Sequence, residues 1–228
     1  MTRNRRRPRR SESRPSIQPS EAWRRIKNPY PPIAQFNEDE LEAIHLTSLN
    51  LLRDKGIKVL SAEAREHYRQ AGANVSEDTL MVQFDPDMLL QTVEQAPASF
   101  TMHGRSANRW IEVGDNNLIF ATVGGPPHYS DLEGGRRAGT HDTFRDLLRM
   151  AQNYDVIHLT TPMVEPQDLP TPVRHLHMTR SVVTLTDKPT FIYSRGREAV
   201  ADSLEILRIA YGIDQQTFEE RVHCYTVV

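Results

Sequence analysis

The stretch that decides the fold is Leu118-Ile-Phe-Ala-Thr-Val-Gly-Gly-Pro-Pro-His-Tyr-Ser-Asp131. Its first six residues form an apolar run with the length and composition of a β-strand. The Gly124-Gly-Pro-Pro127 segment that follows can continue neither a strand ladder nor a helix. We therefore interpret the stretch as a strand that opens onto a loop facing a ligand.

Three further apolar runs follow near Val156, Thr190 and Val222, at intervals of roughly 30 to 40 residues, the length of a strand plus its crossover helix. The helical patterns between them begin after Thr140 and cover about residues 172–185 and 197–211. The second half of the chain is thus predicted to be a parallel βα array that starts at Leu118.

About four βα units are either a small open sheet or half of a barrel, because a TIM (β/α)8 barrel takes eight units over about 250 residues. We predict an α/β fold in which residues 118–228 are the first half of such a barrel. The C-terminus is apolar and lacks a cap or a charged tail. From this we expect the sequence to be the N-terminal part of a longer protein.

A small α+β region of residues 36–117 is predicted ahead of the array. Asn37 and Glu40 have the spacing of a capping box, and they predict a helix that ends before Gly56. Ser61 and Asp85-Pro86 are expected to start two more helices. Short strands are predicted at residues 57–60, 81–84, 100–103 and 110–113, with a turn at 115–117.

Charge is segregated at the N-terminus. Residues 1–14 carry seven arginines and one glutamate, about +6, which leaves about −8 for the rest of a chain whose net charge is −2. Residues 1–35 are predicted to be a disordered tail and a strap in which Trp23, Ile26 and Tyr30 anchor to a folded surface. The alternative is a non-catalytic binding module whose basic arm contacts nucleic acid or an anionic membrane.

Composition excludes several other classes of protein. The chain has 228 residues and 38% hydrophobic content, enough for a sizeable core, but no apolar run of membrane-spanning length and no secretory signal. Its one cysteine, Cys224, excludes an intramolecular disulfide. We expect a soluble, cytoplasmic protein, and the oligomeric state stays open.

After the tail, an ordered series of short motifs resembles the trimethylamine methyltransferase family, in its branch without pyrrolysine that includes glycine betaine methyltransferases. The motifs are Glu40-Leu-Glu-Ala-Ile-His45, Leu51-Leu-Arg-Asp-Lys-Gly56, Gln70-Ala-Gly-Ala-Asn-Val75, Gln95-Ala-Pro97, His103-Gly-Arg105, Thr122-Val-Gly-Gly-Pro126, Ser130-Asp-Leu-Glu-Gly-Gly-Arg136, Val173-Arg-His-Leu-His177 and Thr186-Asp-Lys-Pro189. None is diagnostic alone, and the series as a whole carries the resemblance.

The resemblance implies a β/α barrel that transfers a methyl group from a methylamine, usually a quaternary one such as a betaine, to the Co(I) of a partner corrinoid protein. The cobalamin cofactor would be carried by that partner and not by this chain. Pyrrolysine, where family members have it, lies in a later part of the barrel, so its absence from this sequence does not count as a loss, and whether a missing half carries it stays open. No catalytic residue is assigned from the sequence.

Transfer from a quaternary ammonium releases a neutral amine, so the site needs positioning, aromatic faces and carboxylates more than a general acid. In β/α barrels such groups lie at the carboxyl ends of the strands. The candidates there are Thr122, Gly124, Gly125 and Tyr129 after the first strand, Glu165 and Asp168 after the second, and Tyr193 and Arg195 after the third. The alternative roles are a tight turn, loop acids, a buried tyrosine and an ordinary salt bridge.

Two other sets of residues could be interpreted as a metal site or a phosphate site. His175, His177, His223 and Cys224 lack the spacing of a zinc site, and no metal is predicted. The segments Gly104-Arg105 and Gly134-Gly-Arg-Arg137 are interpreted as structural turns, because neither has the strand, glycine loop and helix order of a phosphate site.

Overall fold

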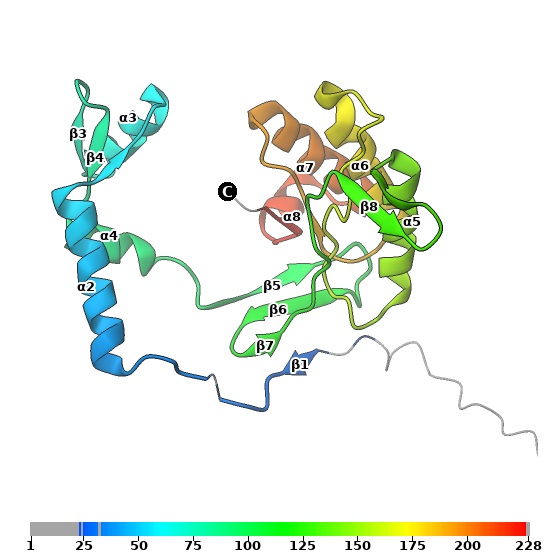
Figure 1. Ribbon diagram of the computed structural model, residues 1–228, viewed down its shortest axis with the longest axis horizontal. Coiled ribbons are helices and arrows are strands. Elements are labelled where there is room, and N and C mark those ends of the chain that lie inside the picture. The colour runs from blue at the N-terminus through cyan, green and yellow to red at the C-terminus, as the bar shows by residue number, and fades with distance from the viewer. Residues whose placement is uncertain (1–22, 24, 32, 227–228) are drawn as a thin grey trace, which may run out of the picture. The chain divides into compact units, whose positions relative to one another are not determined.

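The structure is a computed structural model that describes residues 23, 25–31 and 33–226 (Figure 1). It divides the chain into a smaller unit of residues 28–99 and a larger unit formed by residues up to 27 together with residues from 100 onward. The basic arm of residues 1–14, predicted to be a solvated tail, lies outside the described residues.

The smaller unit packs three helices and a three-stranded antiparallel sheet with the strand order β2-β4-β3. Val82 in the central strand is fully buried, and Phe84 and Ala73 pack with it. The elements are α2 (Glu38–Asp54), β2 (Ile57–Lys58), α3 (Ala62–Gln70), β3 (Asn74–Ser76), β4 (Met81–Gln83) and α4 (Pro86–Val93).

The predicted helix starts of this unit are confirmed. The Asn37 side chain accepts a hydrogen bond from the Glu40 backbone N–H, and the Glu40 carboxylate accepts one from the Asn37 N–H, each at 2.9 Å. The Ser61 hydroxyl accepts a hydrogen bond from the Ala64 N–H at the start of α3, and Asp85 caps α4 ahead of Pro86. These caps satisfy N–H groups that have no partner inside the helix.

The described residues of the larger unit form several small sheets and four helices. Its strands are β1 (Ile26–Lys27), β5 (Ser99–His103), β6 (Trp110–Gly114), β7 (Asn117–Leu118), β8 (His128–Asp131), β9 (Gly135–Ala138), β10 (Thr190–Phe191) and β11 (Cys224–Tyr225). Its helices are α5 (His141–Asn153), α6 (Thr171–Leu185), α7 (Arg197–Tyr211) and α8 (Gln215–Glu219). No helix among the described residues is both long enough and apolar enough to cross a bilayer.

Parallel pairing links the four segments that the sequence spacing singled out. Ala121 bridges Leu159, Thr160 bridges Thr190, and β10 pairs with β11, all in parallel orientation. The ladders are short, and the described residues form no closed barrel. The observed fold is therefore mixed α/β with a parallel array in chain order.

The array does not begin at Leu118 as predicted. Leu118 lies in β7 and pairs antiparallel with Ile26 of β1, and only Ala121 joins the parallel pairing. Asp115 and Asn116 have φ values of 48° and 61°, and this left-handed turn reverses the chain between β6 and β7. The apolar run is thus divided between two ladders.

Residues 100–117 belong with the larger unit, whereas the sequence placed them with residues 36–99. Met102 bridges Val222 in parallel, and the His103 N–H donates to the Val222 carbonyl at 2.8 Å. Met102 is buried with Ile111 and Leu159. This packing ties the β5–β6 hairpin to the last segment of the array.

The predicted strap is present in part. The indole N–H of Trp23 donates to the Trp110 carbonyl at 3.1 Å, and Trp23 packs against the core around Met102. Ile26 forms the short ladder with Leu118. Tyr30 is 73% exposed and anchors nothing.

A core beneath the loops at the carboxyl ends of the array fixes their position. Helix α6 packs between α5 and α7 (Figure 1). The core residues Phe144, Leu148, Val164, Met178 and Val182 fill the space between α5, α6 and the second loop. Tyr129, Met163 and Tyr193 pack against the same cluster, so three successive loops share one support.

Candidate functional site

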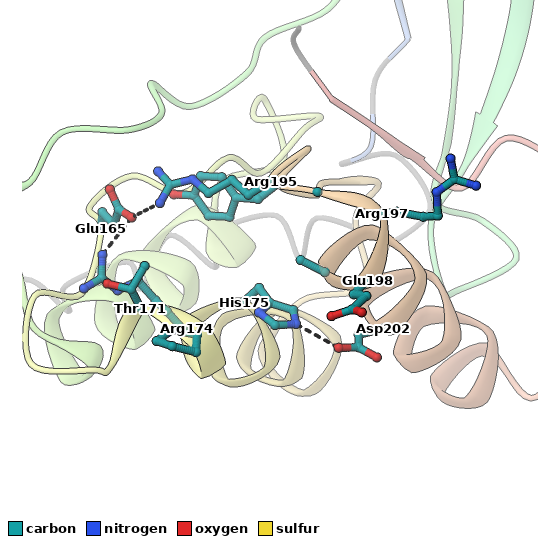
Figure 2. Close-up of a pocket in the computed structure, with 12 residues that line it drawn as sticks. Glu165, Thr171, Arg174, His175, Arg195, Arg197, Glu198 and Asp202 are labelled. Carbon is teal, nitrogen blue, oxygen red and sulfur yellow. Dashed lines mark hydrogen bonds and ion pairs between the residues drawn. The ribbon is translucent and has the colours of Figure 1, made fainter. Parts of the chain in front are cut away.

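Glu165 is the centre of a charged cluster at the carboxyl ends of the parallel segments. Its Oε1 accepts one hydrogen bond from Arg174 and one from Arg195, each at 2.9 Å (Figure 2). Arg174 comes from the first turn of α6, and Arg195 follows β10. Only 12% of the Glu165 side chain and 13% of the Arg174 side chain are exposed, so this pair is well shielded from water.

The carboxylate of Glu165 is held in its charged form. Burial alone would favour the protonated acid, but the hydrogen bonds from Arg174 and Arg195 outweigh it and lower the pKa of Glu165. Arg174 also donates two hydrogen bonds to the Leu169 carbonyl, at 2.9 and 3.3 Å. Arg174 therefore locks the position of Glu165, which in turn orients Arg195.

The glycine–proline loop holds Glu165 from the other side. The Glu165 N–H donates to the Pro126 carbonyl at 2.9 Å, and the Gly125 N–H donates to the Pro162 carbonyl at 2.8 Å. Gly139 has no room for a side chain, because a Cβ there would collide with Val164. These backbone contacts join the loops after the first and second segments of the array.

Tyr193 lies beside the cluster with its hydroxyl buried. The Arg195 guanidinium is 4.7 Å from the centre of the Tyr193 ring, so Arg195 covers one of the faces predicted for a substrate cation. The hydroxyl has no hydrogen-bond partner among the described residues. Burial, together with the charge of Glu165, raises the pKa of Tyr193 to about 12, so the phenol is neutral at physiological pH.

A cavity of about 660 Å³ opens between these residues and the first turns of α6 and α7 (Figure 2). Arg195 lies at its rim and is 54% exposed, so it is accessible to a ligand. Across the cavity, Glu198 and Asp202 project from α7, and Asp202 accepts a hydrogen bond from His175 at 3.0 Å. Arg174 and Arg195 therefore lie on one side, where they pair with Glu165, and the carboxylates of Glu198 and Asp202 lie on the other side, beside Arg197.

The structure separates the predicted site residues into two groups. Glu165, Tyr193 and Arg195 line the cavity together. Thr122, Gly124, Gly125 and Tyr129 do not line it. The Thr122 hydroxyl is hydrogen-bonded to the Thr161 hydroxyl at 2.7 Å.

The remaining candidates of the second group also make structural contacts. A Cβ on Gly124 would meet Thr161 in tight contact, and Gly125 has a φ of +93° that favours glycine. Tyr129 packs on the core beside the Arg137 guanidinium, 5.4 Å from its ring centre. Asp168, outside the cavity, accepts a hydrogen bond from the backbone N–H of His141 at the start of α5.

Sequence reasoning missed Arg174, His175, Glu198 and Asp202 as site residues. Arg174 and His175 lie within the Val173–His177 motif, which carried the resemblance without receiving a role. Glu198 and Asp202 are four residues apart on α7, so both face the cavity, a spacing that could have been noticed. The other histidines lie elsewhere, His177 against His141 and His223 against Phe218.

Comparison with known proteins places the chain in a family. A family model described as trimethylamine methyltransferase (MTTB) matches residues 2–228. The glycine betaine methyltransferase of Desulfitobacterium hafniense (strain Y51) is 31% identical over 178 residues, which are 78% of this chain and 37% of that protein. The trimethylamine methyltransferase MttB of D. hafniense (strain DSM 10664 / DCB-2) is 26% identical over 182 residues, 79% of this chain and 36% of that protein.

A shorter match is to a protein of Methanosarcina. The trimethylamine methyltransferase MttB of Methanosarcina barkeri is 36% identical over 70 residues, 31% of this chain and 14% of that protein. The two D. hafniense matches cover little more than a third of the length of those relatives. Because the family model matches nearly the entire sequence, the chain belongs to the trimethylamine methyltransferase family.

Proposed function

We propose that the protein works as a methyltransferase, or as a part of one, that moves a methyl group from a quaternary or tertiary methylamine such as a betaine to the Co(I) of a partner corrinoid protein. Family membership supports the reaction class. The observation that carries the proposal is the cavity in which Glu165, Tyr193 and Arg195 meet at the carboxyl ends of parallel segments. We further propose that these segments form part of a β/α barrel, the fold in which active sites lie at those ends.

The division of charge across the cavity fits a zwitterion. Arg195 uses one Nη1 contact on Glu165 and keeps other N–H groups for a substrate carboxylate, which guanidinium binds in a bidentate manner. Tyr193 lines the same cavity beside Arg195. Glu198 and Asp202 would attract the fixed positive charge of the ammonium group.

The reaction requires little acid–base catalysis from these residues. A quaternary ammonium leaves as a neutral tertiary amine, so no proton has to be delivered to the leaving group. Holding the methyl group in line with its acceptor is the main task, and fixed binding of both substrate ends achieves it. The corrinoid supplies the Co(I) nucleophile, and the exposed rim at Arg195 leaves the cavity open to a group carried by another protein.

The proposal is tested first by activity. The protein, in the longest form that its coding sequence provides, is incubated with free cob(I)alamin and with glycine betaine, trimethylamine or tetramethylammonium, and methylation is followed from the cobalamin spectrum. We expect transfer from glycine betaine. Absence of transfer from every methylamine, with free cob(I)alamin and with a corrinoid protein alike, would remove the methyltransferase assignment.

A binding experiment then tests the site itself. Arg195→Ala should weaken glycine betaine about tenfold, because it removes a charge-assisted pair with the carboxylate. It should not weaken tetramethylammonium, because the change uncovers the Tyr193 ring and removes a nearby positive charge. Arg149→Ala, on the exposed surface of α5, serves as the control and should change the affinity for neither ligand. Equal weakening of both ligands by Arg195→Ala would contradict carboxylate recognition.

A further inference from the structure

A second cavity lies at the opposite ends of the parallel segments. Its volume is about 560 Å³, within the range of small-molecule sites, and His103, Arg105, Trp110, Tyr211, Arg221 and His223 line it. His223 directly precedes β11, whereas Arg195 follows the parallel β10. The two cavities are therefore separate, and a ligand of the second cavity would bind independently of the proposed methyl transfer.

His223 is the feature of this cavity that requires a ligand. The residue is only 5% exposed, and apart from a weak contact with the His103 backbone neither ring nitrogen has a hydrogen-bond partner among the described residues. Phe218 stacks on the ring at 4.8 Å, and Tyr211 meets it edge-on at 5.1 Å. A buried polar group without a partner costs free energy, and a bound ligand with acceptor oxygens would recover that loss.

The cavity also carries uncompensated positive charge. Arg105 and Arg221 are exposed, and in the described part of the chain neither forms an ion pair. Glu219 and Glu220, which precede Arg221 in the sequence, accept hydrogen bonds from Gln215 and Gln216 instead. Two guanidinium groups with free donors beside one cavity favour a dianion over a neutral molecule.

The carboxylates near this cavity already have hydrogen-bond and ion-pair partners. Asp187 accepts hydrogen bonds from Ser106 and Gln152 and forms an ion pair with Arg109, which also pairs with Asp155. These two carboxylates compensate Arg109 and the buried Lys188, which lies within range of both, and leave the charges of Arg105 and Arg221 without a carboxylate partner among the described residues.

The second histidine adds a donor to the same wall. The His103 ring lies 6.2 Å from that of His223, and burial and the charge of Arg221 lower the pKa of His103. A neutral imidazole still offers one N–H donor. The aromatic side chains are Tyr211 and Trp110, and the Arg25 guanidinium covers one face of the Trp110 ring. With two arginines and two imidazoles beside these rings, the cavity matches a phosphate group attached to a flat body.

We propose that this cavity binds a small phosphorylated molecule, with the phosphate held by Arg105, Arg221 and His223. The Gly104-Arg105 segment, interpreted from the sequence as a structural turn, would then both form a turn and bind the phosphate. Its backbone does form a turn, because the Gly104 N–H bonds the Arg109 carbonyl and the Arg105 N–H bonds the Asp187 carbonyl. The Arg105 side chain is left for the ligand.

The test uses phenyl phosphate, inorganic phosphate and benzoate as probes of the whole chain. Calorimetry measures affinity, and NMR of isotope-labelled histidine follows the ring signals of His103 and His223. We expect saturable 1:1 binding of phenyl phosphate that shifts both histidine signals, weaker binding of inorganic phosphate and the weakest binding of benzoate. Equal or tighter binding of benzoate would overturn the assignment to phosphate.

Three variants locate the binding. Arg105→Ala and Arg221→Ala should each weaken phenyl phosphate about tenfold, the effect of losing a charge-assisted hydrogen bond. Both arginines are exposed and, among the described residues, form no ion pair, so these variants are expected to fold. Arg180→Ala removes an exposed arginine on α6 and should change nothing. No saturable binding, or affinities that the Arg105 and Arg221 variants leave unchanged, would overturn the proposal.

Discussion

Arg174 fixes the position of Glu165, although no pattern in the sequence identifies Arg174 as part of the site. It spans Glu165 and the Leu169 carbonyl from a position with 13% exposure, so its contacts are shielded from solvent. Glu165, Tyr193 and Arg195 could be selected beforehand because each closely follows an apolar segment of the array. Arg174 could not, because its partner is set by how α6 packs against a loop and not by spacing along the chain.

Replacing Arg174 should therefore be costly. Arg174→Met leaves the mostly buried Glu165 with only the exposed Arg195, and we expect a loss of about 2 to 3 kcal/mol in the free energy of unfolding. Arg149→Met, which breaks the exposed Arg149–Asp146 pair on α5, should cost less than about 1 kcal/mol. Denaturant titration of both variants measures this, and equal losses would contradict the role given to Arg174.

Gly56 offers a test of backbone geometry. It has a φ of +71°, and a Cβ there would collide with the Val82 carbonyl oxygen of the central strand β4. Gly72, in the same unit, has a φ of +100°, but the nearest atom to its Cβ would be Met88 Cγ at 3.9 Å.

Both glycine-to-alanine variants suffer the left-handed strain of about 1 kcal/mol, and only Gly56→Ala adds the collision. We expect Gly56→Ala to lose at least about 2 kcal/mol more than Gly72→Ala in thermal or denaturant unfolding of this unit. Similar losses for the two variants would show that β4 shifts to relieve the contact.

At the scale of elements, the longer helices were predicted from sequence, whereas the short helix α8 and most of the sheet pairing were not. The caps at Asn37, Ser61, Asp85 and Thr140 are local signals, and each starts a helix in the structure. The β8–β9 hairpin was missed because its strands are polar and exposed, without the alternation that marks a half-buried strand. The β1–β7 ladder joins residues about ninety positions apart, a distance that no local pattern encodes.

Lys188 links two elements, the end of α5 and the start of β10. Its ammonium group is buried and donates to the carbonyls of Ala151 and Tyr154, at 2.6 and 2.8 Å, where the negative end of the helix dipole favours a cation. Burial, and next the charge of Arg109, lower the pKa of Lys188 to about 8, from an ordinary value of 10.5.

This shift predicts a pH dependence of stability. Above pH 8 the folded protein releases the Lys188 proton while the unfolded chain keeps it, so unfolding takes up a proton and this residue's contribution to stability rises with pH up to about 10.5. The stability difference between wild type and Lys188→Met should grow by about 1 kcal/mol from pH 8 to pH 9. Lys58→Met, at an exposed position, should show no such growth, and a constant difference for Lys188→Met would contradict the shift.

At the scale of the whole molecule, the contacts of the described N-terminal segment begin at Trp23. Deleting residues 1–19 should therefore leave the melting temperature of the larger unit unchanged and should abolish any salt-dependent binding of nucleic acid or anionic vesicles. Trp23→Ala is the contrasting variant, with an expected loss of about 3 kcal/mol from the core around Met102. Salt-dependent binding that survives the deletion would exclude the basic arm as its source.

The pairing of β1 with β7 has a consequence for the connectivity of the protein. Because the chain enters the larger unit at β1, leaves it for residues 28–99 and returns at β5, the smaller unit is an insertion with two points of attachment. A single proteolytic cut within residues 28–99 would release no fragment, because each of the two pieces stays joined to the larger unit. Strand β1, on the N-terminal side of the cut, would stay paired with β7 through Ile26 and held through Trp23. An engineered bridge from Lys27 to Phe100 would excise that insertion while keeping both flanks of the remaining fold.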